Sequence, residues 1–199
     1  MRHQKVDVIL QAAVEVFSDQ GFDQAKMDDI AQAAGVAKGT IYYHFKSKED
    51  LFTGLMDEGM EKLIGCAKRH IDIGDSPVDQ MHGLIRAHSQ FFMENGKLAK
   101  LLLNEAFGTK ERQQKFRASI REYIQLIESL IERGIATGDF QFDYPSEMAI
   151  AIFGAGSVLV LHKLYTLEDS AWTSDESEEV TQMIIQSLSQ LVFRSLLIK

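Results

Sequence analysis

The chain has 199 residues, of which 45% are hydrophobic and 25% charged, and its net charge is −8. Such a composition supports a sizeable core and excludes a disordered chain. The single cysteine, Cys66, excludes an internal disulfide framework and a cysteine-based zinc site, and it fits a reducing compartment. We therefore expect a soluble, cytoplasmic protein.

Two apolar regions resemble export or membrane segments in composition. The N-terminal run is interrupted by Asp7, Gln11 and Glu15, which a signal peptide would lack. The most apolar stretch, Met148–Leu161, has fourteen residues, whereas a helix needs ~18 or more to span a bilayer. The sequence therefore predicts no membrane partner.

The spacing of apolar residues predicts an all-α fold of about nine helices, because no run alternates with period two and the chain has only two prolines. The first helix closes at Gly21, the second covers Met27–Ala34, and the third covers Lys38–Phe45. The first helix has apolar residues three and four positions apart, namely Val6, Ile9, Leu10, Ala13, Val14 and Phe17.

The fourth and fifth helices have clear start signals. Ser47 is followed by acids, and Asp50 stands at the acceptor position of a capping box; this helix is expected to reach about Ile73. The next helix begins at Ser76, directly before a proline, and ends at Asn95.

Four more helices are expected in the last half of the chain, over Lys97–Phe107, Lys110–Ala136, Pro145–Leu167 and the segment that follows Thr173. The third of these is apolar on nearly all sides and rich in small residues. Paired with the apolar side of the last helix, it would form half of a four-helix bundle across a two-fold axis. The sequence thus predicts a homodimer through the last two helices.

Charge is distributed unevenly along the chain. Residues 1–48 hold six basic and six acidic side chains, so the remaining 151 residues carry the whole net charge of −8. Within the first part, Val36–Lys48 contains three lysines and no acid. This segment is therefore the part of the chain best suited to approach a polyanion.

On a helical wheel the third helix has an apolar side and a polar side. Ile41 and Phe45 fall together on the apolar side. The polar side offers hydroxyls, an ammonium, an imidazole and bare backbone, from Lys38, Gly39, Thr40, Tyr42, Tyr43 and His44. Such groups bind phosphates and base edges, and a glycine permits close approach.

The turn before this helix has the spacing of a helix-turn-helix motif. Ala31, Gly35 and Ile41 lie at the first, fifth and eleventh places of an eleven-residue span. A small residue lets the two helices cross closely, a glycine suits a turn of positive φ, and an apolar residue holds the second helix in place.

These stretches, "ILQAAVEVFSDQGF" and "DDIAQAAGVAKGTIYYHFKSKEDL" within residues 9–51, closely resemble the N-terminal domain of TetR-family transcriptional regulators. The resemblance implies a homodimeric protein, usually a repressor, that binds a palindromic operator and is released by a small molecule. It also implies a helix-turn-helix domain over residues 1–47 and a helical ligand-binding and dimerisation domain over residues 48–199.

The resemblance also implies roles for single residues. Tyr42 and Lys48 are expected on phosphates, while Lys46 is either a phosphate contact or a solvated loop lysine. Family members usually open the second helix with Thr or Ser, where this chain has Ala25-Lys26, so an ionic contact from Lys26 is the alternative to a hydroxyl cap. The residues expected at or near base edges are Ala37, Lys38, Gly39, Thr40, Tyr43 and His44.

An effector site is expected among the middle helices. Each candidate is equally well explained as a core aromatic or a solvated polar group. Glu105 lies between apolar residues, and a buried carboxylate needs a partner, which is either Arg121 or a cationic ligand. The candidate ligand-binding residues are His88, Phe92, Glu105, Phe107, Arg121, Tyr123 and Phe153. The fourth helix is expected to carry the signal from this site to the paired third helices.

The sequence does not favour an enzyme. The six histidines contain no pair at three- or four-residue spacing, and neither a zinc-protease motif nor a glycine-rich phosphate loop is present. Cys66 and His70 stand one helical turn apart, but a chance surface pair explains them better than a nucleophile and its base. We therefore expect no catalytic residue, metal or cofactor.

Overall fold

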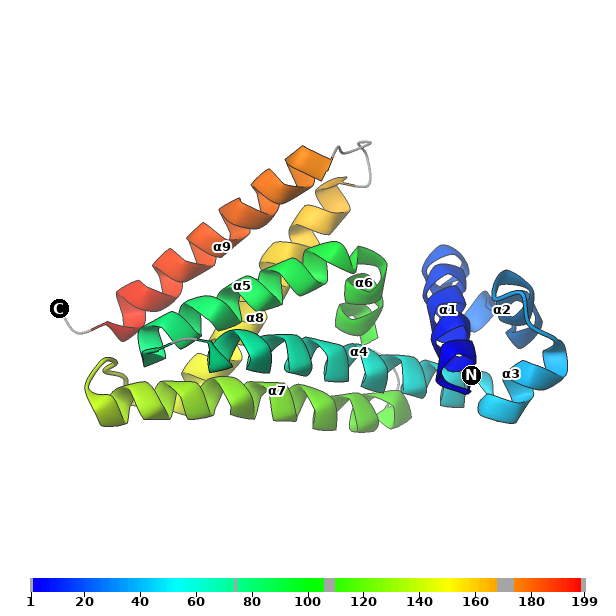
Figure 1. The fold of residues 1–199 in the computed structure, drawn as a ribbon, viewed down its shortest axis with the longest axis horizontal. Coiled ribbons are helices and arrows are strands. Elements are labelled where there is room, and N and C mark those ends of the chain that lie inside the picture. The colour runs from blue at the N-terminus through cyan, green and yellow to red at the C-terminus, as the bar shows by residue number, and fades with distance from the viewer. Residues whose placement is uncertain (1, 74, 106–109, 168–173, 198–199) are drawn as a thin grey trace. The chain divides into compact units, whose positions relative to one another are not determined.

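The computed structural model (Figure 1) describes residues 2–73, 75–105, 110–167 and 174–197. Within these residues the chain forms α-helices, together with an isolated antiparallel bridge between Phe140 and Leu197. The predicted all-α class is confirmed. The helices are α1 (Arg2–Gln24), α2 (Met27–Ala33), α3 (Lys38–His44), α4 (Lys48–Asp72), α5 (Pro77–Glu94), α6 (Gly96–Glu105), α7 (Lys110–Thr137), α8 (Pro145–Leu167) and α9 (Ser174–Leu196).

The chain divides into two compact units. The first contains Met1–Met60 and Lys97–Ala118, and the second contains Glu61–Gly96 and Ser119–Lys199. The helix α4 contributes to both units. The units are defined by contacts and not by function, so the expected boundary between residues 47 and 48 stays a prediction.

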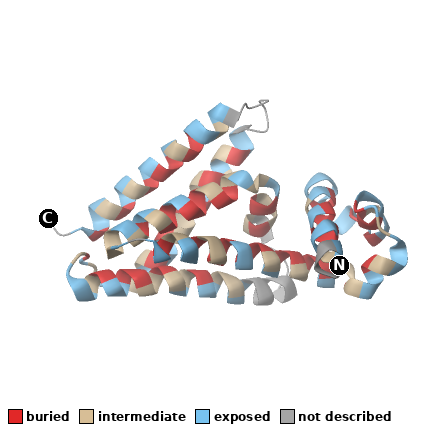
Figure 2. Ribbon diagram, in the orientation of Figure 1, coloured by how far each residue is buried: buried red, intermediate tan, exposed pale blue. Residues whose placement is uncertain are grey.

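The first unit has its core where α1 packs on α2 and α2 packs on α3 (Figure 2). Ile9, Ile30, Ile41 and Leu51 are fully buried there. Three phenylalanines extend this core, with ring centroids 5.3 Å apart for Phe17 and Phe52 and 5.0 Å apart for Phe22 and Phe52. Of the apolar stripe predicted for the first helix, Ile9, Leu10, Ala13 and Phe17 are buried, and Val6 and Val14 are half-buried.

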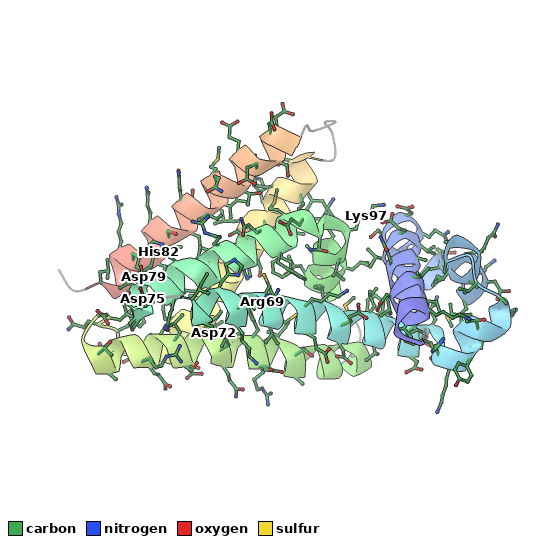
Figure 3. The ribbon with its side chains drawn as sticks, in the orientation of Figure 1. Arg69, Asp72, Asp75, Asp79, His82 and Lys97 are labelled. Atoms are coloured by element: carbon green, nitrogen blue, oxygen red, sulfur yellow. The ribbon has the colours of Figure 1, made fainter. Side chains whose placement is uncertain are left out.

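The helix α6 packs within the same unit. A Cβ atom on Gly59 of α4 would lie 3.3 Å from the Leu98 side chain, so the glycine lets the two helices approach closely. Lys97, labelled in Figure 3, forms ion pairs with Glu15 and Asp19 of α1. The hydrogen bond with Glu15 raises the pKa of Lys97.

Two serines start helices as predicted. The Ser76 hydroxyl accepts a hydrogen bond from the Asp79 N–H at 3.1 Å at the start of α5. The Ser47 hydroxyl accepts one from the Asp50 N–H, also at 3.1 Å. Asp50 in turn accepts from the N–H of Lys46 at 2.9 Å, one residue before its expected partner. Both caps satisfy N–H groups that a helix start leaves unpaired.

In the second unit, α5, α8 and α9 pack against one another (Figure 1). Their contact surfaces are apolar and include Met81, Leu84, Val160, Ile184 and Leu188. The helix α8 is long and apolar enough to cross a membrane by length and composition alone. Its packing on α5 and α9 accounts for that composition equally well, because a helix that is apolar all round is typical of a protein core.

Candidate nucleic-acid interface and buried polar cluster

The turn between α2 and α3 is built by the three residues that the motif predicted. Ala31 is buried, and its carbonyl accepts a hydrogen bond from the Val36 N–H at 3.0 Å. Gly35 has φ 64°, a conformation that side chains with a Cβ rarely adopt. Ile41 is fully buried and holds α3 in place. The predicted helix-turn-helix is therefore confirmed.

The polar side of α3 is presented to solvent. The side chain of Tyr43 is 72% exposed and that of Tyr42 43% exposed, whereas Ile41 and Phe45 are buried as the wheel predicted. The Tyr43 ring lies edge-on to His44, with centroids 5.0 Å apart. Exposure divides the expected contact residues into exposed ones, Ala37, Lys38, Gly39, Tyr42 and Tyr43, and half-buried ones, Thr40 and His44.

Lys38 has a partner that the sequence did not indicate. Its ammonium lies 2.7 Å from a carboxylate oxygen of Asp28 on α2, and both side chains are largely exposed. The hydrogen bond and charge of Asp28 raise the pKa of Lys38. The same ammonium lies 5.9 Å from the centre of the Tyr42 ring. The most prominent cation of α3 is thus paired with an acid of the neighbouring helix.

Lys48 also has partners that the sequence did not indicate. Its ammonium donates to the carbonyl oxygens of Phe22, Asp23 and Ala25 at 2.6, 3.0 and 3.0 Å, and it lies 4.6 Å from the centre of the Phe22 ring. The resemblance implied a phosphate contact here. In the free chain this cation lies at the turn between α1 and α2, and the phosphate contact stays a prediction.

The start of α2 has no hydroxyl cap, as the sequence indicated. Lys26 occupies the cap position in an extended conformation and makes no side-chain hydrogen bond to the helix. Its side chain is exposed, as is that of Lys46 before α4. Both lysines therefore remain accessible to a phosphate.

In the second unit, His88 of α5 and Tyr123 of α7 form a buried polar pair. Nδ1 of His88 lies 3.3 Å from the Tyr123 hydroxyl. The rings of Phe92 and Phe153 lie 4.8 and 6.0 Å from the His88 ring between centroids. We call these four side chains the His88 cluster. It brings together four of the seven predicted ligand-binding residues.

Burial determines the charge state of the cluster. It lowers the pKa of His88 to about 4. Burial, and to a lesser extent the Cys66 thiol, raises the pKa of Tyr123 above its usual value. Both groups are therefore neutral at pH 7, and the cluster offers hydrogen bonds rather than a charge.

The hydrogen-bonding capacity of the cluster is only partly used. Among the described residues, His88 Nε2 and the hydroxyls of Ser89 and Ser157 are buried without a hydrogen-bond partner. A Cβ atom on Gly156 of α8 would lie 2.8 Å from His88 Nε2, so the glycine lets the imidazole pack on bare backbone. Neither serine was predicted as a polar group of this site, although a serine within an apolar helix is itself a signal.

The other predicted ligand-binding residues lie elsewhere or outside the description. Arg121 is exposed on α7, two residues before Tyr123. Two of the predicted groups lie outside the described part of the structure: the side chain of Glu105 and the whole of Phe107. The expected choice of partners for Glu105 thus stays a prediction.

Several acidic residues lie between the end of α4 and the first turn of α5. Asp72, Asp75 and Asp79 lie there near His82 (Figure 3). In the part of the chain that the structure describes, no group of three or more His, Cys, Asp or Glu residues has the arrangement of a metal site.

The sulfur of Cys66 lies 3.9 Å from Nδ1 of His70, and that nitrogen also lies 3.0 Å from the Cys66 carbonyl oxygen.

Comparison with known proteins agrees with this geometry. Residues 9–55 match the family described as bacterial regulatory proteins of the tetR family, and residues 74–160 match a tetracycline repressor-like C-terminal domain. A fatty acid metabolism regulator protein of Bacillus subtilis is 30% identical over 134 residues, which cover 67% of this chain and 69% of that protein.

Two solved structures resemble nearly the whole chain. One is named "Clostridium perfringens putative fatty acid metabolism regulator", with TM-score 0.81, 27% identity and coverage of 96% of this chain and 100% of that one. The other is FadR of Bacillus subtilis in complex with stearoyl-CoA, with TM-score 0.80, 26% identity and coverage of 93% and 96%. The chain therefore belongs to the TetR family and is a ligand-responsive, DNA-binding transcriptional regulator.

Proposed function

We propose that this regulator is a cytoplasmic repressor that binds a palindromic operator as a homodimer and is released by a long-chain acyl-CoA. The observation that carries the choice of effector is the similarity, over almost the full length of both chains, to a regulator in complex with stearoyl-CoA. The relative that acts in fatty acid metabolism supports the same chemical class. Cytoplasmic localisation follows from the operator, since bacterial DNA is there.

In this proposal α3 enters the major groove. The residues at or near base edges are Ala37, Lys38, Gly39, Thr40, Tyr43 and His44, and the phosphate contacts come from Lys26, Tyr42 and Lys46. The acid-free polar side of α3 supports the first set, because hydroxyls and ammoniums pair with base edges. The exposure of Lys26, Tyr42 and Lys46 supports the second.

The dimer is proposed to form through α8 and α9. Each helix exposes large apolar side chains, among them Ile150 and Val158 of α8 and Met183 and Leu191 of α9. Val158 is 65% exposed in the single chain. A substantial apolar surface of this kind is typical of an interface, and a symmetric dimer is needed to reach both half-sites of a palindrome.

The effector is proposed to bind in the second unit next to the His88 cluster. Phe92 and Phe153 offer apolar contacts to an acyl chain, and the neutral His88–Tyr123 pair offers a hydrogen bond to a thioester carbonyl. Arg121, exposed on the same helix as Tyr123, suits the phosphates of the coenzyme. A hydrogen bond to the orphaned buried Nε2 of His88 would recover free energy that the free protein lacks.

The signal is proposed to travel along α4, which contributes residues to both compact units. The effector then favours a spacing of the two α3 helices that does not match the operator. Converting a population from 99% competent to 1% competent requires about 5.5 kcal/mol of differential affinity between the two states. An acyl-CoA that bound both states equally would release nothing.

The test uses the full-length protein and a fluorescent duplex selected by that protein from a random pool. We expect stearoyl-CoA to lower the affinity for this duplex at least tenfold, while coenzyme A alone and stearate alone have little effect. If acyl-CoAs of all chain lengths leave the affinity unchanged, the effector class is wrong. If no duplex is selected at low salt, the assignment of α3 as the DNA-reading helix is wrong.

A further inference from the structure

The ammonium of Lys48 is completely occupied by the protein backbone. It donates to the carbonyl oxygens of Phe22, Asp23 and Ala25 at 2.6, 3.0 and 3.0 Å. A lysine ammonium has three N–H donors, so these bonds account for all of them. Lys48 is also the first residue of α4. The start of α4 is therefore fixed to backbone that lies more than twenty residues earlier in the chain.

Two of the acceptors, Phe22 and Asp23, lie in the last turn of α1, and the third, Ala25, directly follows it. Gly21, with φ 76° and ψ 158°, interrupts the helical conformation near the end of α1. Carbonyls at the end of a helix lack intrahelical donors, and the helix dipole makes this end negative. A lysine from another helix supplies both the donors and the positive charge.

A second contact fixes the same two parts. The Lys48 ammonium lies over the Phe22 ring, at 4.6 Å from its centre. That ring contacts Phe52, one helical turn after Lys48 on α4, with centroids 5.0 Å apart. The first turn of α4 thus holds the α1–α2 turn with a cation and with an aromatic ring.

We propose that Lys48 is a positioning residue that fixes the DNA-binding module to the first turn of α4, and that it is not a phosphate ligand. A phosphate would have to displace at least one of the three carbonyl hydrogen bonds that already satisfy the ammonium. When the first turn of α4 moves, the α1–α2 turn, and with it the helix-turn-helix, has to follow. The inference rests on the proposed function in one respect, namely that movement of α4 is the signal that α3 receives.

The first test does not involve DNA. Amide hydrogen exchange of residues 19–30 is measured in the full-length protein and in Lys48→Met, which keeps an apolar stem and removes the three donors. We expect at least tenfold faster exchange in this segment in the variant. Lys46→Met, which removes the same charge two residues earlier, is the control and should leave the segment protected. Equal protection in all three proteins would overturn the proposal.

The second test separates a clamp from a phosphate contact. The affinity for the selected duplex is measured against salt concentration. We expect Lys48→Met to lower the affinity at every salt concentration while the slope of log K against log salt changes by less than about half a unit. Loss of one phosphate contact from each protomer would instead reduce the slope by roughly 1.8 for the dimer. A reduction of that size would overturn the proposal.

Arginine provides the decisive comparison. Lys48→Arg keeps the charge, but its planar fork does not converge on three carbonyls as an ammonium does. We expect the arginine variant to bind the duplex as weakly as the methionine variant. Wild-type affinity in Lys48→Arg would show that charge alone matters and would overturn the clamp. If Lys48→Met does not fold, Lys48→Gln replaces it with the same expected outcomes.

The two tests also distinguish the failure of this inference from the failure of the proposed function. If the wild-type protein selects no duplex, the DNA assignment fails, and the exchange experiment still decides whether Lys48 fixes the α1–α2 turn. If the duplex is bound and released by stearoyl-CoA while exchange is unchanged in Lys48→Met, only the clamp is wrong.

Discussion

The two compact units differ in whether the polar groups compared below have hydrogen-bond partners within the protein. In the first unit, the Lys48 ammonium finds three carbonyl acceptors. In the second unit, His88 Nε2 and the Ser157 hydroxyl are buried without a partner among the described residues. An unsatisfied buried polar group costs about 1–3 kcal/mol. The DNA-binding module is therefore completed by its own backbone, whereas the interior around His88 keeps hydrogen-bonding capacity that a ligand can use.

The largest expected effect tests whether the exposed side of α3 contributes to DNA binding but not to the stability of the fold. Tyr43→Ala should cost about 1–3 kcal/mol of binding free energy at each half-site of the selected duplex. Because the side chain is 72% exposed, the free energy of unfolding should change by less than about 0.5 kcal/mol. Competition binding with single-base variants of the duplex, together with urea unfolding, measures both quantities.

This first prediction has two ways to fail. An equal loss of affinity for every duplex would make Tyr43 a phosphate contact and not a reader of bases. A large loss of stability would mean that Tyr43 belongs to the core of the module, and the contrast between the two units would then disappear.

The second effect tests the interior. Burial lowers the pKa of His88 to about 4 from its ordinary value of 6.5, so the unfolded chain takes up the proton more readily than the folded one. The contribution of His88 to stability is therefore complete above pH 6.5 and is lost as the pH falls towards 4. Between pH 7.5 and 5.0 the loss is about 2 kcal/mol.

His88→Leu removes this titration, so its free energy of unfolding should fall by about 2 kcal/mol less than that of the wild type over the same pH range. Urea unfolding at the two pH values measures the difference. His162→Leu, which removes an exposed imidazole from α8, controls for the loss of a histidine as such. The same pH dependence in His88→Leu and the wild type would contradict the role of burial.

The third effect compares two glycines of α8. A Cβ atom on Gly156 would lie 2.8 Å from His88 Nε2 and 3.1 Å from Leu188, whereas one on Gly154 would meet nothing within 4 Å. Alanine gains about 1 kcal/mol in helix propensity at either position, but at Gly156 overpacking costs about 1–3 kcal/mol. Gly156→Ala should therefore be destabilised by about 1 kcal/mol, while Gly154→Ala should be stabilised.

Thermal or urea unfolding of the two variants measures the third effect, and each variant is the control of the other. Gly156→Ala should also weaken the response to stearoyl-CoA, since the added methyl group lies against the imidazole that is proposed to bind the thioester. Equal stability of the two variants would show that the neighbours of Gly156 move to accommodate the methyl group and that the His88 cluster is loosely packed.

Local signals in the sequence were sufficient for the helix starts and for the sides of α3. The Ser47 and Ser76 caps depend on residues within three positions, and the burial of Ile41 and Phe45 follows from the helical period alone. The positive φ of Gly35 was expected for the same reason, because the turn needs a residue without a Cβ.

Contacts between distant residues were beyond the same reasoning. Lys48 meets carbonyls more than twenty residues away, and His88 meets Tyr123 at a separation of 35 residues. Spacing along one helix indicates which side of it is polar, but not which backbone or ring lies opposite. The four members of the His88 cluster were predicted one by one as polar or aromatic residues, and only the packing of α5, α7 and α8 brings them together.

The smallest effect concerns the ion pair between Lys38 and Asp28, which are 2.7 Å apart at the exposed end of α3. In the free protein Asp28 holds the cation and adds a negative charge near the phosphates. Asp28→Asn releases the lysine and removes this charge, so affinity for unselected DNA should rise roughly two- to fivefold while affinity for the selected duplex rises less. Specificity, measured as the ratio of the two affinities at one salt concentration, should fall. Gln32→Glu, which adds a charge at an exposed position of α2, the helix that carries Asp28, should lower both affinities. If Asp28→Asn leaves binding to unselected DNA unchanged, Asp28 does not restrain Lys38. The first unit would then, like the interior around His88, contain a polar group that can bind a new partner without losing an old one.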